Sequence, residues 1–426
     1  MTSSGLARGA LAAPLLLLAW ACFLPPPSPA SPANYTLAAQ SALRAGDVDL
    51  ADKVLAEARN RYPDDGAVRL WSAELASMRW EDQQARRDLL AARRTPDRGG
   101  FREDELDGKI GDLLFRMGRY GESVPRLTAG RIGPIGAARQ AWAAIARNLP
   151  YERAPIELEA AELPLVETVL PQLVCSIDGE DYPFVLDTRA TFTTLANSLA
   201  RELPVSPILP AGNAVDGVGA EFASSFGVLR SFSLGGIEVG PLPVLVVDDG
   251  VLALRDHFGG AQRSPKALVG FDVLSRFRVT FDPSRSSVVF QQRRGLTGPD
   301  SRPCLWVEDN LLVEVQIEGR RLWFVLDTGA SASSLSEVGL QMLPGGERRA
   351  LQRFGKVYSP GGVKLSARMV EGLVLELSGV RFIGVDLQVV EREAPELFPV
   401  HGVLGADLLM RCRTTMDSGR IHLESL

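Results

Sequence analysis

The distribution of apolar and polar positions divides the chain into two parts that meet at about residue 155. From Thr36 to about Pro150, apolar residues recur with the period of an α-helix, and alanine, leucine and arginine dominate. After Pro155 short runs rich in β-branched residues are separated by glycine, proline and aspartate. Such runs are typical of strands joined by tight turns. The pattern therefore predicts an all-α first third and an all-β remainder.

The helical part contains a repeat of 34 positions (85 − 51). Three small or apolar residues recur at this spacing: Ala51, Leu55 and Ala58 return as Ala85, Leu89 and Ala92. Pro63 and Pro96 close the two units, and a third, looser unit runs from Gly118 to Leu127. The pattern resembles the tetratricopeptide repeat, although the tryptophan-leucine-glycine signature is missing. The resemblance implies a concave groove for a peptide or protein partner. The alternative is a helical prefix that only packs on the next domain.

The all-β part contains one segment twice, at an offset of 140 positions (327 − 187). The copies read Phe184-Val185-Leu186-Asp187-Thr188-Arg189-Ala190 and Phe324-Val325-Leu326-Asp327-Thr328-Gly329-Ala330. In each copy an apolar run that predicts a buried strand ends at a carboxylate. A carboxylate in such a place is costly unless it is hydrogen-bonded or takes part in chemistry. Asp187 and Asp327 are therefore candidate catalytic residues.

The two copies also end alike, at an offset of 135 positions (402 − 267). The matched residues are Ala267–Leu274 with Gly402–Leu409, Arg276 with Arg411, Arg278 with Arg413, Thr280 with Thr415, Asp282 with Asp417, and Arg285 with Arg420. The double alignment indicates one domain present twice. Asp272 and Asp407 begin short predicted helices, where a carboxylate caps amide groups, so we expect structural roles for them. Asp282 and Asp417, in predicted hairpin turns, have the same interpretation.

The second copy carries a nameable motif. Two apolar residues precede Asp327 in Asp-Thr-Gly-Ala-Ser, and an apolar-apolar-Gly followed by a short helix comes 78 positions later (405 − 327). This resembles the retropepsin-like aspartic proteases, and in particular their exported bacterial branch. The resemblance covers about residues 160–426. It implies two all-β closed-barrel lobes in one chain, a pepsin-like pseudo-dimer behind the all-α repeat, with one aspartate from each lobe in a shared site.

The resemblance also implies the chemistry. Two carboxylates close together cannot both ionise, so they share one proton. The ionised carboxylate acts as general base on a water, and the protonated one polarises the scissile carbonyl of a peptide or unfolded protein. No metal, histidine or cofactor is required. Residues expected to support the site are Thr328, Gly329, Thr188, Ala330, Ser331 and Arg189. The two threonines would hydrogen-bond across the lobes, and the glycine would let its N–H approach a carboxylate.

A flap hairpin is expected between each Asp-Thr and its closing glycine. In the second copy, Phe354 to Val363 fits such a hairpin, and in the first copy Val215 to Gly219 fits. The substrate-binding residues expected there are Tyr358, Gly361, Gly362, Gly217 and Gly219. Family resemblance implies that the flaps clamp an extended peptide by strand addition. For Tyr358 a solvent-edge position is the alternative.

Arg189 departs from the family pattern, which has glycine at this position. The side chain could point outward and leave a working dyad of Asp187 and Asp327. It could instead pair with Asp187, lower the pKa of that carboxyl and abolish proton sharing. In a third arrangement, the second copies of two chains form the dyad. These alternatives set a peptidase against two rivals: a non-catalytic peptide-binding module and a scaffold that acts through its helical repeat.

The N-terminus predicts export. Arg8 and an apolar stretch from Ala10 to Leu24 precede small residues at Ser28 and Ala30, as in a secretory signal peptide. An uncleaved anchor is the alternative, and a lipoprotein anchor at Cys22 is disfavoured by the neighbouring tryptophan. The predicted divisions are residues 1–30 for the signal, 34–150 for the repeats, and 156–295 and 302–426 for the lobes. We expect a periplasmic or extracellular protein with no membrane span after signal removal.

Charge and cysteine content narrow the function further. A net charge of −6 argues against a nucleic-acid binder, which normally carries a basic face. No cysteine and histidine spacing resembles a metal site. In an oxidising compartment Cys304 and Cys412 could form a disulfide, and three core thiols, with Cys175, are the alternative. Because the domain is duplicated within the chain, a monomer suffices for a dyad, although a dimer is also compatible.

Overall fold

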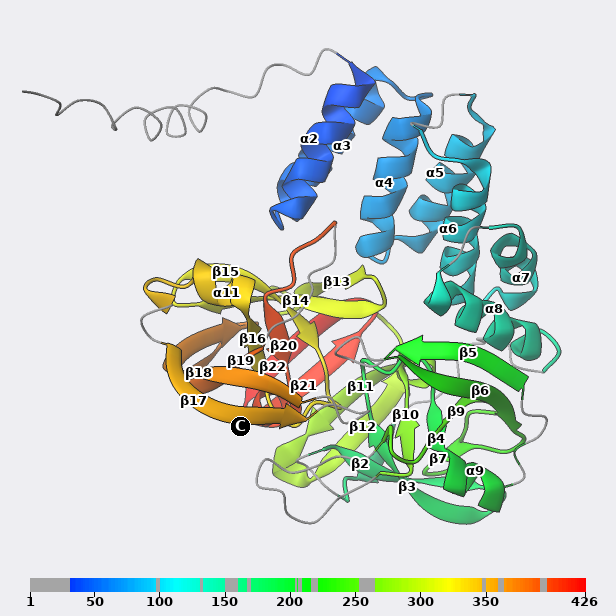
Figure 1. The fold of residues 1–426 in the computed structure, drawn as a ribbon, viewed down its shortest axis with the longest axis vertical. Coiled ribbons are helices and arrows are strands. Elements are labelled where there is room, and N and C mark those ends of the chain that lie inside the picture. Colours follow the sequence, from blue (N-terminus) through cyan, green and yellow to red (C-terminus); the bar gives the residue numbers. More distant parts are fainter. Residues whose placement is uncertain are drawn as a thin grey trace, which may run out of the picture.

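The computed structural model describes residues 31–96, 100–130, 133–149, 160–166, 170–203, 205, 209–215, 221–252, 265–346, 350–358, 364–390 and 397–426. Within these residues an arc of helices lies over two β-rich lobes (Figure 1). The predicted fold class is confirmed: an all-α prefix precedes two all-β lobes. The predicted signal segment, residues 1–30, lies outside the described residues. No helix in the described part of the chain is long and apolar enough to cross a membrane.

The helical layer consists of consecutive antiparallel helices. These are α2 (Pro32–Arg44), α3 (Val48–Arg61), α4 (Gly66–Met78), α5 (Asp82–Arg94), α6 (Glu103–Arg116), α7 (Tyr120–Ala129) and α8 (Pro134–Ala146). Carboxylates begin two of them, because Asp47 accepts from the Leu50 amide at 2.9 Å and Asp65 from the Val68 amide at 2.9 Å. The three small or apolar repeat positions lie in α3 and return in α5, and all six residues are buried. The repeat therefore marks the faces on which the helices pack.

Close approach of α6 and α7 depends on a small residue. A Cβ added to Gly111 of α6 would lie 2.8 Å from the Leu127 side chain of α7. Small residues at such contacts allow two helix backbones to approach closely, as the repeat interpretation expects. The looser third unit of the repeat, Gly118 to Leu127, covers the turn before α7 and most of α7 itself.

The first lobe is formed mainly by strands. Its elements are β1 (Ala161–Pro164), β2 (Gln172–Ile177), β3 (Glu180–Leu186), β4 (Thr194–Ala196), α9 (Asn197–Glu202), β5 (Leu209–Val215), β6 (Glu221–Leu229), β7 (Ser233–Leu234), β8 (Ile237–Glu238), β9 (Leu242–Val247), β10 (Ala267–Val269), α10 (Phe271–Leu274), β11 (Phe277–Asp282), the 3₁₀ turn η1 (Pro283–Arg285) and β12 (Ser287–Gln292). The central strand β3 lies between β2, its antiparallel hairpin partner, and β10, its parallel neighbour.

The second lobe repeats this order with longer strands. Its elements are β13 (Arg302–Val307), β14 (Asn310–Ile317), β15 (Arg320–Leu326), β16 (Ser334–Ser336), α11 (Glu337–Met342), β17 (Ala350–Tyr358), β18 (Lys364–Leu377), β19 (Val380–Val390), β20 (Gly402–Leu404), α13 (Ala406–Leu409), β21 (Cys412–Asp417) and β22 (Arg420–Ser425). Strand β15 lies between β14 and the parallel β20, as β3 lies between β2 and β10. The internal alignment of the sequence thus corresponds to matching topology.

The two lobes share a sheet. Strand β11 pairs antiparallel with β21, and the matched residues Thr280 and Thr415 face each other with their hydroxyl oxygens 2.9 Å apart. Two ion pairs flank this contact: Arg278 Nε to Asp417 Oδ2 at 3.1 Å, and Arg413 Nε to Asp282 Oδ2 at 3.4 Å. The two aspartates therefore bind the opposite lobe, and not only their own turns as the sequence suggested.

The helical layer packs on both lobes. Trp323 of β15 lies among apolar residues of α2, α3 and α4, and its indole N–H donates to the Gly46 carbonyl at 3.0 Å. At the other end of the arc, the fully buried Trp142 of α8 donates to the Pro243 carbonyl of β9 at 3.1 Å. Because each lobe accepts a different end of the arc, the helices fix the position of one lobe relative to the other.

The three described cysteines are free thiols in the cores of the lobes. Cys304 lies on β13 and Cys412 on β21, and burial raises the pKa of their thiols to about 12 and about 11. Burial also raises the pKa of Cys175. The expectation of a disulfide between Cys304 and Cys412 is therefore wrong, and the alternative of three core thiols describes the structure.

Candidate active site

Each candidate carboxylate lies where a central strand ends. The backbone N–H of Asp187 donates to the Val269 carbonyl at 3.0 Å, and that of Asp327 donates to the Leu404 carbonyl at 3.0 Å. These bonds continue the parallel pairing of β3 with β10 and of β15 with β20. Both carboxylate loops are thereby held at equivalent points of their lobes.

Two threonines join the carboxylate loops. The Thr188 amide donates to the Thr328 hydroxyl at 3.0 Å, and the Thr328 amide donates to the Thr188 hydroxyl at 3.1 Å. Each hydroxyl also donates to a carbonyl of the opposite lobe, Thr188 to Leu326 at 2.9 Å and Thr328 to Leu186 at 2.7 Å. Both threonine side chains are buried. This reciprocal network is the cross-lobe bonding that the sequence predicts, and it brings the ends of the two strands together.

Gly329 lies directly against the partner carboxylate. A Cβ added to this glycine would lie 2.5 Å from Cγ and 2.9 Å from Oδ1 of Asp187, which is closer than real contacts allow. Only glycine therefore fits this position without displacing Asp187. The distance also shows that the Asp-Thr-Gly loop of the second lobe reaches the aspartate of the first.

The Asp187 carboxyl group is strongly perturbed. Burial, followed by the negative charge of Asp327, raises the pKa of Asp187 to about 7. Three interactions act in the opposite direction: the amides of Arg189 and Ala190 donate to Oδ1 at 2.8 and 3.0 Å, and the Arg189 side chain carries a positive charge. Because the raising causes are larger, Asp187 binds a proton below about pH 7.

Arg189 reaches across the site to the other lobe. Its Nη1 lies 3.6 Å from Oδ2 of Asp327, and its Nε donates to Oδ1 of Asn310 at 3.3 Å. The side chain thus points across the lobe boundary and not outward, and its charge lowers the pKa of Asp187 less than burial raises it. The physical reason is that backbone amides already bind the Asp187 carboxylate of the same loop. The long Arg189 side chain extends instead to Asp327 and Asn310, which face it across the lobe boundary. Asn310 carried no signal in the sequence.

The neighbouring loop residues hold the carboxylate loops to the short helices. The carbonyl of Ala330 accepts from the Ala406 amide at 2.8 Å, and that of Ala190 accepts from the Phe271 amide at 2.7 Å. Ser331 is exposed on the same loop. The bonds to the Ala330 and Ala190 carbonyls are equivalent in the two lobes. Ala330 therefore supports the carboxylate loop, as expected.

Asp272 and Asp407 are structural, but for another reason than helix capping. The amide and hydroxyl of Thr193 donate to Oδ1 of Asp272 at 2.8 and 2.9 Å, and the Ser333 hydroxyl donates to Oδ1 of Asp407 at 2.6 Å. Neither short helix has a side-chain cap. Thr193 and Ser333 each follow a candidate catalytic aspartate by six positions (193 − 187 and 333 − 327). That shared spacing was the signal that could have identified them.

The strands that flank each predicted flap pair with each other in antiparallel fashion. Strands β5 and β6 pair from Val215 opposite Glu221, and β17 and β18 pair from Tyr358 opposite Lys364. The connecting residues 216–220 and 359–363 lie outside the described part of the chain. The predicted flap residues Gly217, Gly219, Gly361 and Gly362 are among them.

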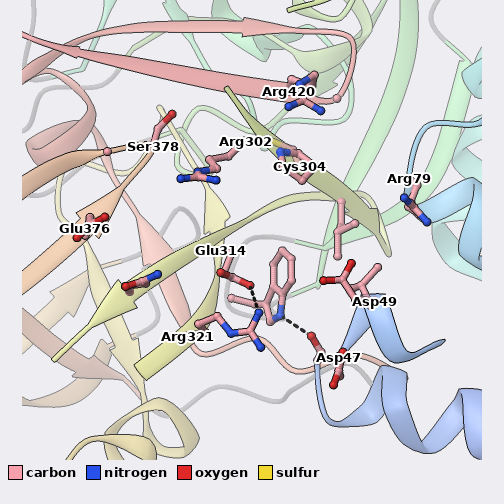
Figure 2. A pocket seen from close by; sticks show the side chains of 18 of the residues that line it. Asp47, Asp49, Arg79, Arg302, Cys304, Glu314, Arg321, Glu376, Ser378 and Arg420 are labelled. Carbon is pink, nitrogen blue, oxygen red and sulfur yellow. Dashed lines mark hydrogen bonds and ion pairs between the residues drawn. The ribbon is translucent and has the colours of Figure 1, made fainter. Parts of the chain in front are cut away.

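Two of the cavities in the described part of the chain lie between the helical layer and the lobes. One, of about 560 Å³, lies between the α2–α3 turn and the second lobe, where Figure 2 shows Glu314 and Arg321 turned toward each other. The other, of about 420 Å³, lies under α4 and α6 and includes Thr191 of the first catalytic loop in its wall. Neither cavity contains the aspartates of the candidate dyad. No group of metal-binding side chains occurs in the described part of the chain.

Comparison with protein families identifies both lobes. The family model described as "Aspartyl protease" matches residues 173–273 and again residues 313–408. Each match spans one candidate aspartate and the closing helix of its lobe. No curated protein matches the sequence.

Three solved structures illustrate what this chain is similar to. The aspartic proteinase from Irpex lacteus is 12% identical, with a TM-score of 0.38, and the match covers 62% of this chain and 97% of that one. A retropepsin-like aspartic protease from Rickettsia conorii is 15% identical, with a TM-score of 0.23, and covers 31% of this chain and 99% of its own. Basic 7S globulin from soybean is 13% identical, with a TM-score of 0.37 and coverages of 63% and 95%.

Proposed function

Because both β lobes of this chain belong to the aspartyl protease family, we propose that it is an aspartic endopeptidase with Asp187 and Asp327 as its dyad. The observation that carries the proposal is the reciprocal threonine network, which brings one aspartate from each lobe to a common site. A dyad within one chain makes a monomer sufficient.

The two aspartates have different roles in the proposed mechanism. Asp187 holds a proton below about pH 7, whereas Asp327 lies opposite the guanidinium of Arg189. Asp327 takes a proton from water as the water oxygen attacks the carbonyl carbon, and Asp187 gives its proton to the carbonyl oxygen. Asp327 then gives this proton to the amide nitrogen as the C–N bond breaks, and Asp187 takes back a proton from a hydroxyl of the tetrahedral intermediate, so a carboxylic acid and an amine leave.

Cleavage of an unstructured protein tests this proposal. We expect the purified protein to cut unfolded β-casein below about pH 7, and a statine-type transition-state mimic to inhibit the reaction. Asp327→Asn should lower kcat/KM by about 10³-fold, because loss of a positioned general base costs about that factor. If the variant cuts as fast as the natural protein, the mechanism is wrong.

A specific observation favours a second candidate function. The guanidinium of Arg189 lies 3.6 Å from the carboxylate that must activate water. A guanidinium in this place occupies the side of Asp327 that a water would approach, and the chain would then be a peptide-binding module with a family fold. A large gain of activity in Arg189→Gly, from an inactive natural protein, would select this candidate.

Export and partner binding complete the proposal. The leader-like sequence of residues 1–30 supports a periplasmic or extracellular location, and N-terminal sequencing of the mature chain tests it. The paired helices support a tetratricopeptide-like interaction surface.

A further inference from the structure

Arg189 stands where the second lobe has glycine, and its backbone is fixed at the candidate active site. Its amide donates to Oδ1 of Asp187 at 2.8 Å, as part of the loop that holds this carboxylate. The Arg189 side chain is therefore accommodated by its own torsions, within reach of Asp327. The place of the guanidinium decides how strongly it engages the carboxylate that must activate water.

The guanidinium of Arg189 lies close to Asp327 but not at the distance of a direct hydrogen bond. Nη1 lies 3.6 Å from Oδ2 of Asp327, whereas a charge-assisted hydrogen bond between such groups is about 2.7 to 2.9 Å long. The Arg189 side chain is 22% exposed and that of Asp327 is 11% exposed, so water screens their attraction only in part. Such an attraction closes the gap unless another contact holds the guanidinium back.

Asn310, the first residue of β14, supplies such a contact. Its Oδ1 accepts a hydrogen bond from Nε of Arg189 at 3.3 Å. Because the guanidinium is planar, an acceptor on Nε constrains the direction in which both Nη atoms point. The side-chain amide of Asn310 donates to the Glu308 carbonyl at 2.7 Å and to the Val307 carbonyl at 3.4 Å. Asn310 is thus bound to its own turn through Nδ2 and to Arg189 through Oδ1.

The turn that carries Asn310 is held by the helical layer. Glu308 and Asp309, between β13 and β14, have positive φ angles of 45° and 64°, as in a tight two-residue hairpin turn. The Asp309 carboxylate pairs with Arg139 of α8, and these two side chains are 10% and 12% exposed. Nη1 of Arg139 also lies 2.7 Å from Oδ1 of Asp112 in α6. The helices therefore determine where the Asn310 acceptor lies.

We propose that Asn310 is a positioning residue, which holds the Arg189 guanidinium back from a direct hydrogen bond to Asp327 and leaves that carboxylate free to accept a proton from water. The inference rests on the proposed peptidase function, and it explains how the first lobe can carry arginine in place of glycine. Through Arg139 and Asp309, the helical layer determines the place of this restraint. Without the Asn310 acceptor the guanidinium moves to the carboxylate, because a hydrogen bond to a charged acceptor is stronger than one to a neutral amide oxygen.

The first test removes the acceptor and measures whether the effect depends on Arg189. Asn310→Ala should lower kcat/KM for a casein peptide about tenfold, since one hydrogen bond to a charged group contributes roughly the free energy of a tenfold change. In the background Arg189→Ala, which has no guanidinium to restrain, the same substitution should have no effect on kcat/KM. A structural role of Asn310 in its turn alone would give the same loss in both backgrounds, and that result would overturn the inference. A folded Asn310→Ala variant that cuts as fast as the natural protein would also overturn it.

The link to the helical layer is tested at Arg139. Arg139→Ala removes the ion pair to Asp309 and should lower kcat/KM by less than Asn310→Ala does, because Asn310 keeps the bonds to its own turn. This loss should also vanish in the Arg189→Ala background. The matched control Arg147→Ala, at an exposed position just after α8, should leave kcat/KM unchanged. Thermal unfolding of each variant establishes that it is folded. A loss in Arg139→Ala that persists without Arg189 would overturn the role given to the helices.

Crystal structures of the natural protein and of Asn310→Ala separate this inference from the proposed function. We expect the distance from Nη1 of Arg189 to Oδ2 of Asp327 to shorten from 3.6 Å to about 2.8 Å in the variant. An unchanged or longer distance would overturn the inference, whether or not the natural protein is an active peptidase. If the distance shortens but the natural protein cleaves no casein peptide, the restraint on Arg189 stands and the peptidase proposal fails.

Discussion

The two lobes of this chain are built alike, yet their catalytic loops treat the partner carboxylate differently. In the second lobe, Gly329 brings bare backbone against Asp187. In the first lobe, the matching position is Arg189, which directs a positive charge at Asp327. One aspartate is thus enclosed by backbone amides and its pKa is raised, whereas the other is placed opposite a guanidinium. One substitution in a duplicated domain is enough to make the two carboxylates inequivalent.

This comparison suggests that Asp187 and Asp327 have fixed roles. In a symmetric pair either carboxylate can hold the shared proton. Here burial and the charge of Asp327 favour the proton on Asp187, although the charge of Arg189 opposes them, and in the proposed mechanism this makes Asp187 the general acid. The threonine network is unaffected by the difference, since both threonines keep their reciprocal bonds.

The largest effect is expected from alanine substitutions at the two matched positions, 329 and 189. Gly329→Ala should lower kcat/KM about a hundredfold, because a Cβ would displace the Asp187 carboxylate and a shift of that kind costs about this factor. The matched variant Arg189→Ala, where a side chain is already present, should not cause this loss. A casein cleavage assay measures kcat/KM of both variants. Equal losses of kcat/KM would contradict the proposed difference between the two lobes.

A second test detects the protonation of Asp187 from the pH dependence of the free energy of unfolding. Its pKa is raised to about 7 in the folded protein, above its ordinary value, so it contributes stability at low pH that is lost as the pH rises through about 7. Asp187→Asn removes this loss and should be more stable than the natural protein at pH 8 by about 4 kcal/mol, which is the rise in pKa from 3.8 to about 7 at about 1.4 kcal/mol per unit. Urea unfolding at pH 4 and pH 8 measures the difference. An Asn variant that gains no stability on going to pH 8, relative to the natural protein, would show that Asp187 is ionised throughout.

The smallest effect concerns the pH profile of activity. The charge of Arg189 lowers the pKa of Asp187, although burial outweighs it. Arg189→Gly should therefore move the alkaline limb of kcat/KM to higher pH, and Arg189→Lys, which keeps the charge, should leave it near that of the natural protein. A pH–rate profile on a casein peptide checks both variants. An unchanged limb in Arg189→Gly would mean that another group controls it.

Much of the architecture could be predicted because it depends on local or repeated sequence. The helical repeat at 34 positions, the two copies of the Asp-Thr segment and the matched closing segments are all visible along the chain. They predict the all-α prefix and the two β lobes, and the resemblance to aspartic proteases implies the threonine network that joins Thr188 to Thr328. The period of apolar residues and the residue types in turns are short-range properties, so they can be recognised in a single sequence.

The tertiary structure decided the contacts between segments far apart in the sequence. The direction of Arg189, the binding of Asp272 to Thr193, and the attachment of Asp309 to Arg139 depend on which surfaces meet when the lobes and helices pack. A long charged side chain has several staggered conformations, and the neighbours that select one of them are 121 positions away in the case of Asn310 (310 − 189). The sequence therefore determined where the two carboxylates lie in the fold and that their loops differ, and packing decided that Arg189 contacts Asp327.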